Sequence, residues 1–157
     1  MKSLTQHINE KLVLNSNNKI RKYNYHPKTA DELEALVKRL IMERGNEADL
    51  NDIDTSEITD MSVLFHTSDF NGDISNWDVS NVEDMSWMFR DSKFNKDISK
   101  WDVSNVIKLS QMFLGSEFNQ DISKWNLSSL RFMLDSDIEN IFKNCPIKEE
   151  YKPKIKF

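Results

Sequence analysis

Apolar residues recur along this chain at a fixed spacing of 24, the step from Trp77 to Trp101, and this period constrains the fold more than any other feature of the sequence. Aspartate and serine positions repeat in phase with them. The apolar columns are Trp77, Trp101 and Trp125; Phe70, Phe94, Phe118 and Phe142; Leu50, Ile74, Ile98 and Ile122; Ile58, Val82, Val106 and Leu130; and Met61, Met85, Leu109 and Met133. Such a period indicates units that bury their apolar faces against their neighbours. We expect four units, at residues 49–72, 73–96, 97–120 and 121–144.

The pattern inside one unit predicts its local structure. Ile74, Trp77 and Val79 end in the alternation of a short half-buried strand. Met85 and Met88 follow at a spacing of three, which is typical of a tight helical or 3₁₀ segment. The predicted fold class is therefore an α/β repeat: a short leucine-rich-repeat-like solenoid with one strand and one helical or 3₁₀ segment per unit.

The residues on either side of the repeats are expected to cap its ends, because terminal units expose core. Residues 1–48 predict a helix, a strand and a second helix, and residues 145–157 predict a tail over the last unit. The first helix is expected within 3–14 and the strand within 20–25. The second helix has a capping box that starts at Thr29, and Gly45 marks its end. The alternating tail 152–157 is predicted to be an edge strand protected by lysines or a frayed end.

One motif identifies a resemblance. Residues 70–82 read Phe-Asn-Gly-Asp-Ile-Ser-Asn-Trp-Asp-Val-Ser-Asn-Val, and Met85-Ser-Trp-Met-Phe89 follows. Residues 49–134 thereby resemble the BspA-like leucine-rich repeats, a domain of unknown function found in mycoplasma surface lipoproteins. The resemblance implies a right-handed solenoid, a role in adhesion or protein binding, and no shared enzymatic activity. Similar short chains are associated with gut Bacteroides-type bacteria and their phages.

Composition and charge narrow the function classes. The 157 residues are 38% hydrophobic with one cysteine, and no apolar run is long enough to span a bilayer. No export signal is visible, which predicts a cytoplasmic location and leaves a surface or virion location open. Residues 49–144 carry a net charge of −10, against +3 before them and +2 after them. This acidity disfavours nucleic acid, whose phosphates need basic partners, and favours a basic or mixed-charge protein.

Two rows of polar residues are expected to point outward from the strands. Asp54, Asp78, Asp102 and Asn126 form one row, and Asp52, Asn76, Lys100 and Lys124 form the neighbouring row. These eight residues are the predicted partner-binding site. The alternative is that the aspartates and the serines that follow them only hydrogen-bond turn amides.

Other polar columns predict structural roles. Asp49, Asp73, Asp97 and Asp121 are expected to cap local amides, and Asn71, Asn95 and Asn119 to form an internal amide ladder. The sequence predicts no catalytic residue, no cofactor and no metal site. The three histidines are isolated, and three glycines are too few for a nucleotide-binding loop.

The sequence therefore predicts a non-enzymatic protein–protein interaction module that uses an acidic face. Two alternatives stay open. One is a virion or assembly protein that associates with copies of itself, and the other is an intracellular inhibitor of a host protein, in one version encoded by a phage.

Overall fold

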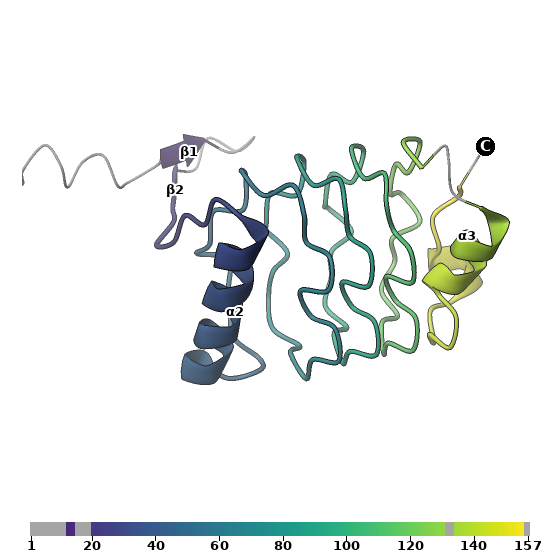
Figure 1. The fold of residues 1–157 in the computed structure, drawn as a ribbon, viewed down its shortest axis with the longest axis horizontal. Coiled ribbons are helices and arrows are strands. Elements are labelled where there is room, and N and C mark those ends of the chain that lie inside the picture. The colour runs from purple at the N-terminus through teal and green to yellow at the C-terminus, as the bar shows by residue number, and fades with distance from the viewer. Residues whose placement is uncertain (1–11, 15–19, 131–133, 156–157) are drawn as a thin grey trace, which may run out of the picture.

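The computed structural model describes residues 12–14, 20–130 and 134–155. Strands β1 (Leu12–Leu14) and β2 (Ile20–Lys22) form an antiparallel pair with Leu12 opposite Lys22. The helices are α2 (Ala30–Arg44), α3 (Asp135–Ile141) and the 3₁₀ helix η1 (Glu149–Tyr151). Figure 1 shows α2 at one end and α3 at the other end of a stack of chain turns. We call each turn of the stack, which is one period of the sequence, a coil.

The predicted leucine-rich-repeat-like solenoid of strands and helical segments is wrong. Residues 45–130, which the structure describes throughout, contain turns and isolated bridges but no strand, sheet or helix. Two parallel bridges, Asp49–Asp73 and Asp60–Asp84, each join positions that are one period apart. The period is therefore the spacing of non-regular coils that lie side by side (Figure 1).

Backbone conformation explains why no helical segment forms. The second part of each of the first three coils has two residues in the left-handed region, four positions apart, as at Val63 (φ 56°) and Thr67 (φ 54°). A right-handed 3₁₀ or α-helix cannot continue through such a residue. The amide of Phe65 instead donates to the carbonyl of Met88 in the next coil at 2.9 Å. Left-handed φ values recur at Trp87, Asp91, Gln111 and Gly115.

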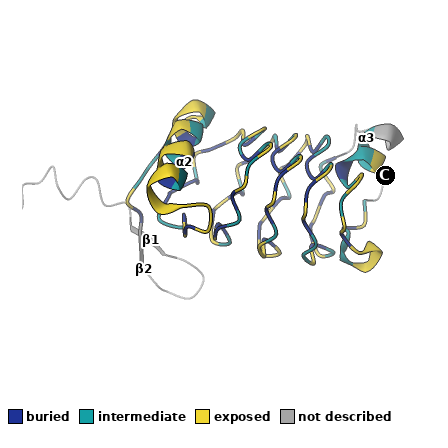
Figure 2. Cartoon of the chain, turned by 90° about the horizontal axis from the view of Figure 1, so that it is seen from below, coloured by how far each residue is buried: buried dark blue, intermediate teal, exposed yellow. Residues whose placement is uncertain are grey.

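Aromatic rings stack through the core from coil to coil. Phe65, Phe89, Phe113 and Phe142 form one column with ring centroids 5.5–5.6 Å apart. Phe70, Phe94 and Phe118 form a second column at 6.3 Å. The sequence places Phe142 in the second column, but it stacks on Phe113. Figure 2 shows buried and exposed segments alternating along each coil around this core.

The period-related tryptophans are buried, as predicted, at 4–5% exposure. Each indole N–H donates to a carbonyl of the preceding coil: Trp77 to Leu50 at 2.9 Å, Trp101 to Ile74 at 3.2 Å, and Trp125 to Ile98 at 3.2 Å. The buried donor is thus satisfied without water. Each bond also joins two neighbouring coils.

The predicted asparagine ladder is confirmed. The amide oxygen of Asn71 accepts from the backbone N–H of Asn95, and that of Asn95 accepts from Asn119, both at 2.9 Å. Asn119 in turn accepts from the N–H of Lys148 at 3.1 Å. The asparagine oxygens therefore accept from turn amides that no regular sheet would pair.

The N-terminal segment differs from the predicted helix–strand–helix cap. Residues 12–14 form a strand, not the end of a helix, and the rest of the helix predicted within 3–14 lies outside the described residues. The second helix begins as predicted, since Thr29 Oγ1 accepts from the Glu32 amide at 3.2 Å. The Glu32 carboxylate accepts from the Lys28 amide at 2.7 Å, one residue before the position that a capping box uses. Buried Leu33, Val37 and Leu40 join the core from this helix.

The period breaks near the C-terminal end. The Phe89 amide donates to the carbonyl of Met112, which lies 23 residues later in the chain. The equivalent amide of the next coil, at Phe113, donates to Ile141, which lies 28 residues later. Helix α3 occupies the extra length of chain between Phe113 and Ile141. The predicted unit 121–144 therefore does not keep its period to the end.

The C-terminal tail packs on the last coil, as predicted. The Ile122 amide donates to the Tyr151 carbonyl at 3.0 Å, and buried Ile147 joins the core. Residues 152–155 form no strand, and the rest of the predicted edge strand lies outside the described residues. The tail is therefore attached by single contacts and not by a strand pairing.

Candidate functional site

Three rows of polar residues run along the stack with one residue per coil. The second and third rows hold the eight residues that the sequence predicts for partner binding. We call the surface formed by all three rows the polar face. The first row is Asp49, Asp73, Asp97 and Asp121; the second is Asp52, Asn76, Lys100 and Lys124; the third is Asp54, Asp78, Asp102 and Asn126.

Third-row side chains hold turns together. Asp78 Oδ1 accepts from the amide of Ser80 at 3.0 Å and from its hydroxyl at 2.6 Å. Asp102 makes the same pair of bonds with Ser104 at 3.1 and 2.6 Å. These are the turn contacts predicted as the alternative to a binding row. Asp78, Asp102 and Asn126 are nevertheless exposed, so their role in binding stays a prediction.

The expectation that Asp54 points to solvent is wrong. Its exposure is only 4%, because the N-terminal segment covers the first coil. His26 Nδ1 lies 3.2 Å from Asp54 Oδ2, and the Ser56 hydroxyl donates to Asp54 Oδ1 at 2.6 Å. The continuous carboxylate row predicted for this column therefore begins at Asp78.

Asp52 is also engaged by the N-terminal segment. Arg44 donates to both of its carboxylate oxygens at 3.0 Å, and the Asn24 side chain donates to it at 2.8 Å. Burial acts to raise the pKa of Asp52, but the hydrogen bonds from Arg44 and Asn24 outweigh it and the pKa is lowered. The predicted acidic start of the second row is thus neutralised by Arg44.

First-row carboxylates cap amides as predicted. Asp73, Asp97 and Asp121 accept from the amides of the serines two residues later at 2.8–2.9 Å. The amide and side chain of Ser99 lower the pKa of Asp97, and this outweighs both its burial and the like charge of Asp121. The pKa of Asp97 is therefore lowered although carboxylates repeat from coil to coil beside it.

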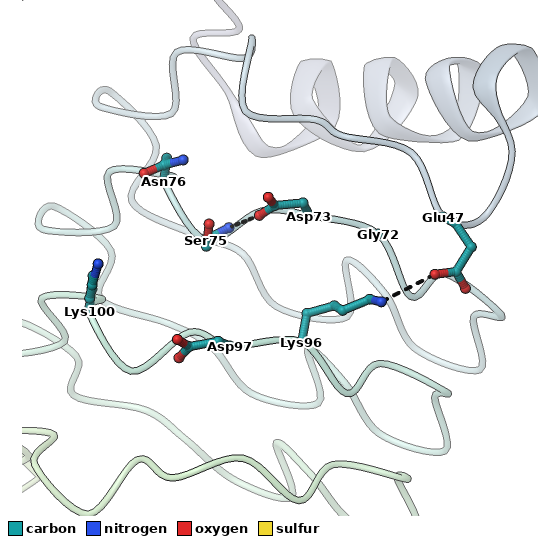
Figure 3. Close-up of a pocket in the computed structure, with 8 residues that line it drawn as sticks. All are labelled: Glu47, Gly72, Asp73, Ser75, Asn76, Lys96, Asp97 and Lys100. Carbon is teal, nitrogen blue, oxygen red and sulfur yellow. Dashed lines mark hydrogen bonds and ion pairs between the residues drawn. The ribbon is translucent and has the colours of Figure 1, made fainter. Parts of the chain in front are cut away.

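Two open hollows lie on the polar face, one coil apart. The first has a volume of about 370 Å³, and its lining includes Asp73, Ser75, Asn76, Asp97 and Lys100 (Figure 3). The second has a volume of about 270 Å³ and is lined by Asp97, Ser99, Gln120, Asp121 and Lys124. Each residue that lines the second hollow lies one period after a residue of the first, with Gln120 in the position of Lys96. The hollow is therefore a feature of the repeat and not an accident of one loop.

The structure brings three of the eight predicted residues into these hollows: Asn76, Lys100 and Lys124. First-row aspartates, for which the sequence predicts only a role in capping local amides, line the hollows as well. Lys96 stands where the coil before has Gly72, and its ammonium lies 3.4 Å from Glu47 at the rim of the first hollow (Figure 3). The sequence analysis did not select Lys96. The replacement of glycine by lysine at this repeat position is the signal that could have identified it.

Elsewhere on the surface, Trp87 is 37% exposed, unlike the three tryptophans of the period. The guanidinium of Arg90 lies 4.2 Å from its ring centroid and donates to Gln111 at 2.7 Å.

Within the described ranges, no three histidine, cysteine or acidic side chains cluster in a way that could hold a metal ion. No described helix combines the length and the apolar character that crossing a membrane requires.

We expect acid to destabilise the protein through these aspartates. Serine hydrogen bonds lower the folded-state pKa of Asp97 and, against the effect of burial, that of Asp73, below the ordinary value of 3.8. Their stabilisation is therefore complete above about pH 4 and is lost as the pH falls through the folded-state values. Urea unfolding at pH 3 and pH 6 measures the loss. The double variant D73N/D97N keeps a turn-capping oxygen and should lose less; an identical loss would contradict the assignment.

The comparisons with known proteins give one match. The family model described as "Mycoplasma protein of unknown function, DUF285" matches residues 33–151. The match agrees with the mycoplasma part of the resemblance seen in the sequence and does not extend to BspA-like leucine-rich repeats. No curated protein and no solved structure matches the chain.

Proposed function

We propose that this chain, which belongs to the DUF285 family of Mycoplasma proteins of unknown function, is a protein-binding module. Its polar face would bind a partner that is basic or of mixed charge. The observation that carries the proposal is the set of exposed carboxylates that serine hydrogen bonds hold in one orientation in successive coils. Asp73, Asp97 and Asp121 form this set in the first row, and Asp78 and Asp102 extend it in the third.

Charge supports a protein partner of this kind. Between Arg44 and Arg90 the chain contains eleven acidic residues and no lysine or arginine. A surface with this excess attracts basic partners over several ångströms and repels phosphate backbones. Pre-oriented carboxylates also lose less conformational entropy on binding than free ones.

The charges of the second row indicate a partner segment that carries both basic and acidic residues. It is neutral at Asn76 and basic at Lys100 and Lys124, while the first row stays acidic beside it. A purely basic partner would meet repulsion at both lysines. We therefore expect acidic side chains among the basic ones of the partner segment.

A random-sequence peptide library displayed against the immobilised full chain tests the proposal. We expect basic peptides to be enriched at low salt and lost at high salt. The variant D97N/D102N removes one charge from each acidic row and keeps the turn-capping oxygens, so binding should weaken roughly tenfold.

The matched control is D60N/E83Q, which removes two charges outside the polar face. Asp60 also caps a serine amide, at 2.8 Å from Ser62, so asparagine preserves the same type of turn. Equal weakening by both variants, or salt-independent enrichment, would contradict the proposal. Light scattering that shows salt-tolerant, concentration-dependent oligomers would instead favour the assembly alternative.

A further inference from the structure

We infer that the two hollows bind an extended partner segment of the form Arg-Glu-Arg, with one arginine at each hollow and the glutamate beside Lys100. The inference rests on the proposed function and names the partner chemistry that the polar face would recognise. It follows from three features of the hollows: their carboxylates, their spacing and the position of the lysines.

Each hollow has two first-row carboxylates in its lining, in addition to Glu47 at the rim of the first. Asp73 and Asp97 line the first, and Asp97 and Asp121 line the second. A serine amide engages Oδ1 of each first-row carboxylate and fixes its direction, as Figure 3 shows for Ser75 and Asp73. A planar guanidinium presents five donors and can bond two carboxylates at once, which favours arginine over lysine at each hollow.

The spacing of the coils suits every second residue of an extended chain. Core rings in successive coils stack with centroids 5.5–6.4 Å apart. Side chains i and i+2 of an extended peptide lie on one side of it, about 6.6 Å apart. A peptide that runs along the stack can therefore place residues i and i+2 at the two hollows in turn.

The lysines determine the residue between the two arginines. Residue i+1 lies between the two arginines, at the level of the third coil. Its side chain points to the opposite edge of the peptide, which is the edge beside the second row. Lys100 is the second-row residue of that coil and lines the first hollow. A glutamate at i+1 therefore meets an opposite charge, whereas a basic residue there would be repelled.

Asp97 is the test residue because it lines both hollows, whereas Asp60 also caps a serine amide but lies outside the polar face and lines neither hollow. A fluorescent peptide with a central Arg-Glu-Arg is titrated into the full chain, with an Arg-Arg-Glu peptide of the same composition for comparison. We expect D97N to weaken binding roughly tenfold and D60N by less than about twofold. The rearranged peptide should bind more weakly than the original.

A charge reversal gives a second measurement. The variant K100E should prefer Arg-Lys-Arg to Arg-Glu-Arg, since the position opposite residue i+1 is now acidic. An unchanged preference, or equal weakening by D97N and D60N, would overturn the inference. Circular dichroism and urea unfolding check that each variant is folded.

The outcome separates this inference from the proposed function. If D97N/D102N weakens binding of library peptides as expected while Arg-Glu-Arg binds no better than Arg-Arg-Glu, only the Arg-Glu-Arg assignment fails. If the double variant binds library peptides as the unchanged chain does, both proposals fail.

Discussion

Replacing Phe89 by alanine is expected to lower the free energy of unfolding by about 3–5 kcal/mol. The side chain is fully buried and stacks on Phe65 at 5.5 Å, on Phe113 at 5.6 Å and on Phe94 at 4.4 Å. Its removal leaves a cavity in the middle of the aromatic column. The coils of residues 45–130 have no sheet to hold them together, so side-chain packing carries much of their association. Urea unfolding followed by tryptophan fluorescence measures the change.

Phe142→Ala is the matched control for this substitution. Phe142 ends the same column, is only partly buried, and stacks on Phe113 alone among the described rings. Its loss should cost less than half as much. Equal losses at the middle and at the end of the column would show that stacking does not accumulate along the coils.

The substitution Asp54→Ala is expected to cost about 3–5 kcal/mol, because it breaks a buried polar cluster and leaves His26 without its carboxylate. Asp78→Ala removes the same turn contact from the next coil, where the side chain is exposed, and should cost only about 1 kcal/mol. Both aspartates hold a serine at the same geometry, so the difference reports the burial of Asp54 together with its contact with His26. Urea unfolding of the two variants supplies the comparison.

A double-mutant cycle with His26→Ala identifies the source of that difference. If the contact between His26 and Asp54 carries it, the two substitutions together should cost clearly less than the sum of their separate effects. Additive losses, or equal losses at Asp54 and Asp78, would contradict this account of the N-terminal segment.

This segment also decides how much of the polar face a partner can reach. Arg44 neutralises Asp52 and His26 covers Asp54, so two of the eight predicted binding residues serve the attachment of the N-terminal segment to the first coil. The accessible part of the polar face is therefore shifted toward the second, third and fourth coils. Most of the residues that line the two hollows belong to these coils.

Side-chain periodicity was readable from the sequence because the same residue types meet the same environment in every coil. Trp77, Trp101 and Trp125 are buried, Asn71 and Asn95 form the amide ladder, and the first-row aspartates cap their turns, as the pattern predicts. These roles depend on local spacing and on the chemistry of the side chain alone.

Backbone conformation was not readable in the same way. An apolar spacing of three, as at Met85 and Met88, suits a helical segment and also a series of turns with left-handed residues. Nothing in the residue types at Val63 or Trp87 signals a positive φ, since branched and aromatic residues disfavour it by about 1–2 kcal/mol. Hydrogen bonds to the next coil stabilise that conformation, and they exist only once the coils are stacked.

The sequence by itself determined the period of the repeats, their aromatic and amide columns, and the acidic excess of residues 49–144. Each of these follows from residue type and spacing. Only the tertiary structure decided that the coils are non-regular, that Phe142 changes column, that Asp52 and Asp54 are covered, and that the first-row aspartates and the lysines share two hollows. The physical reason is that each of these depends on contacts between residues that lie in different coils or segments and are far apart in the chain. Such contacts select among local conformations that the sequence pattern leaves equally acceptable.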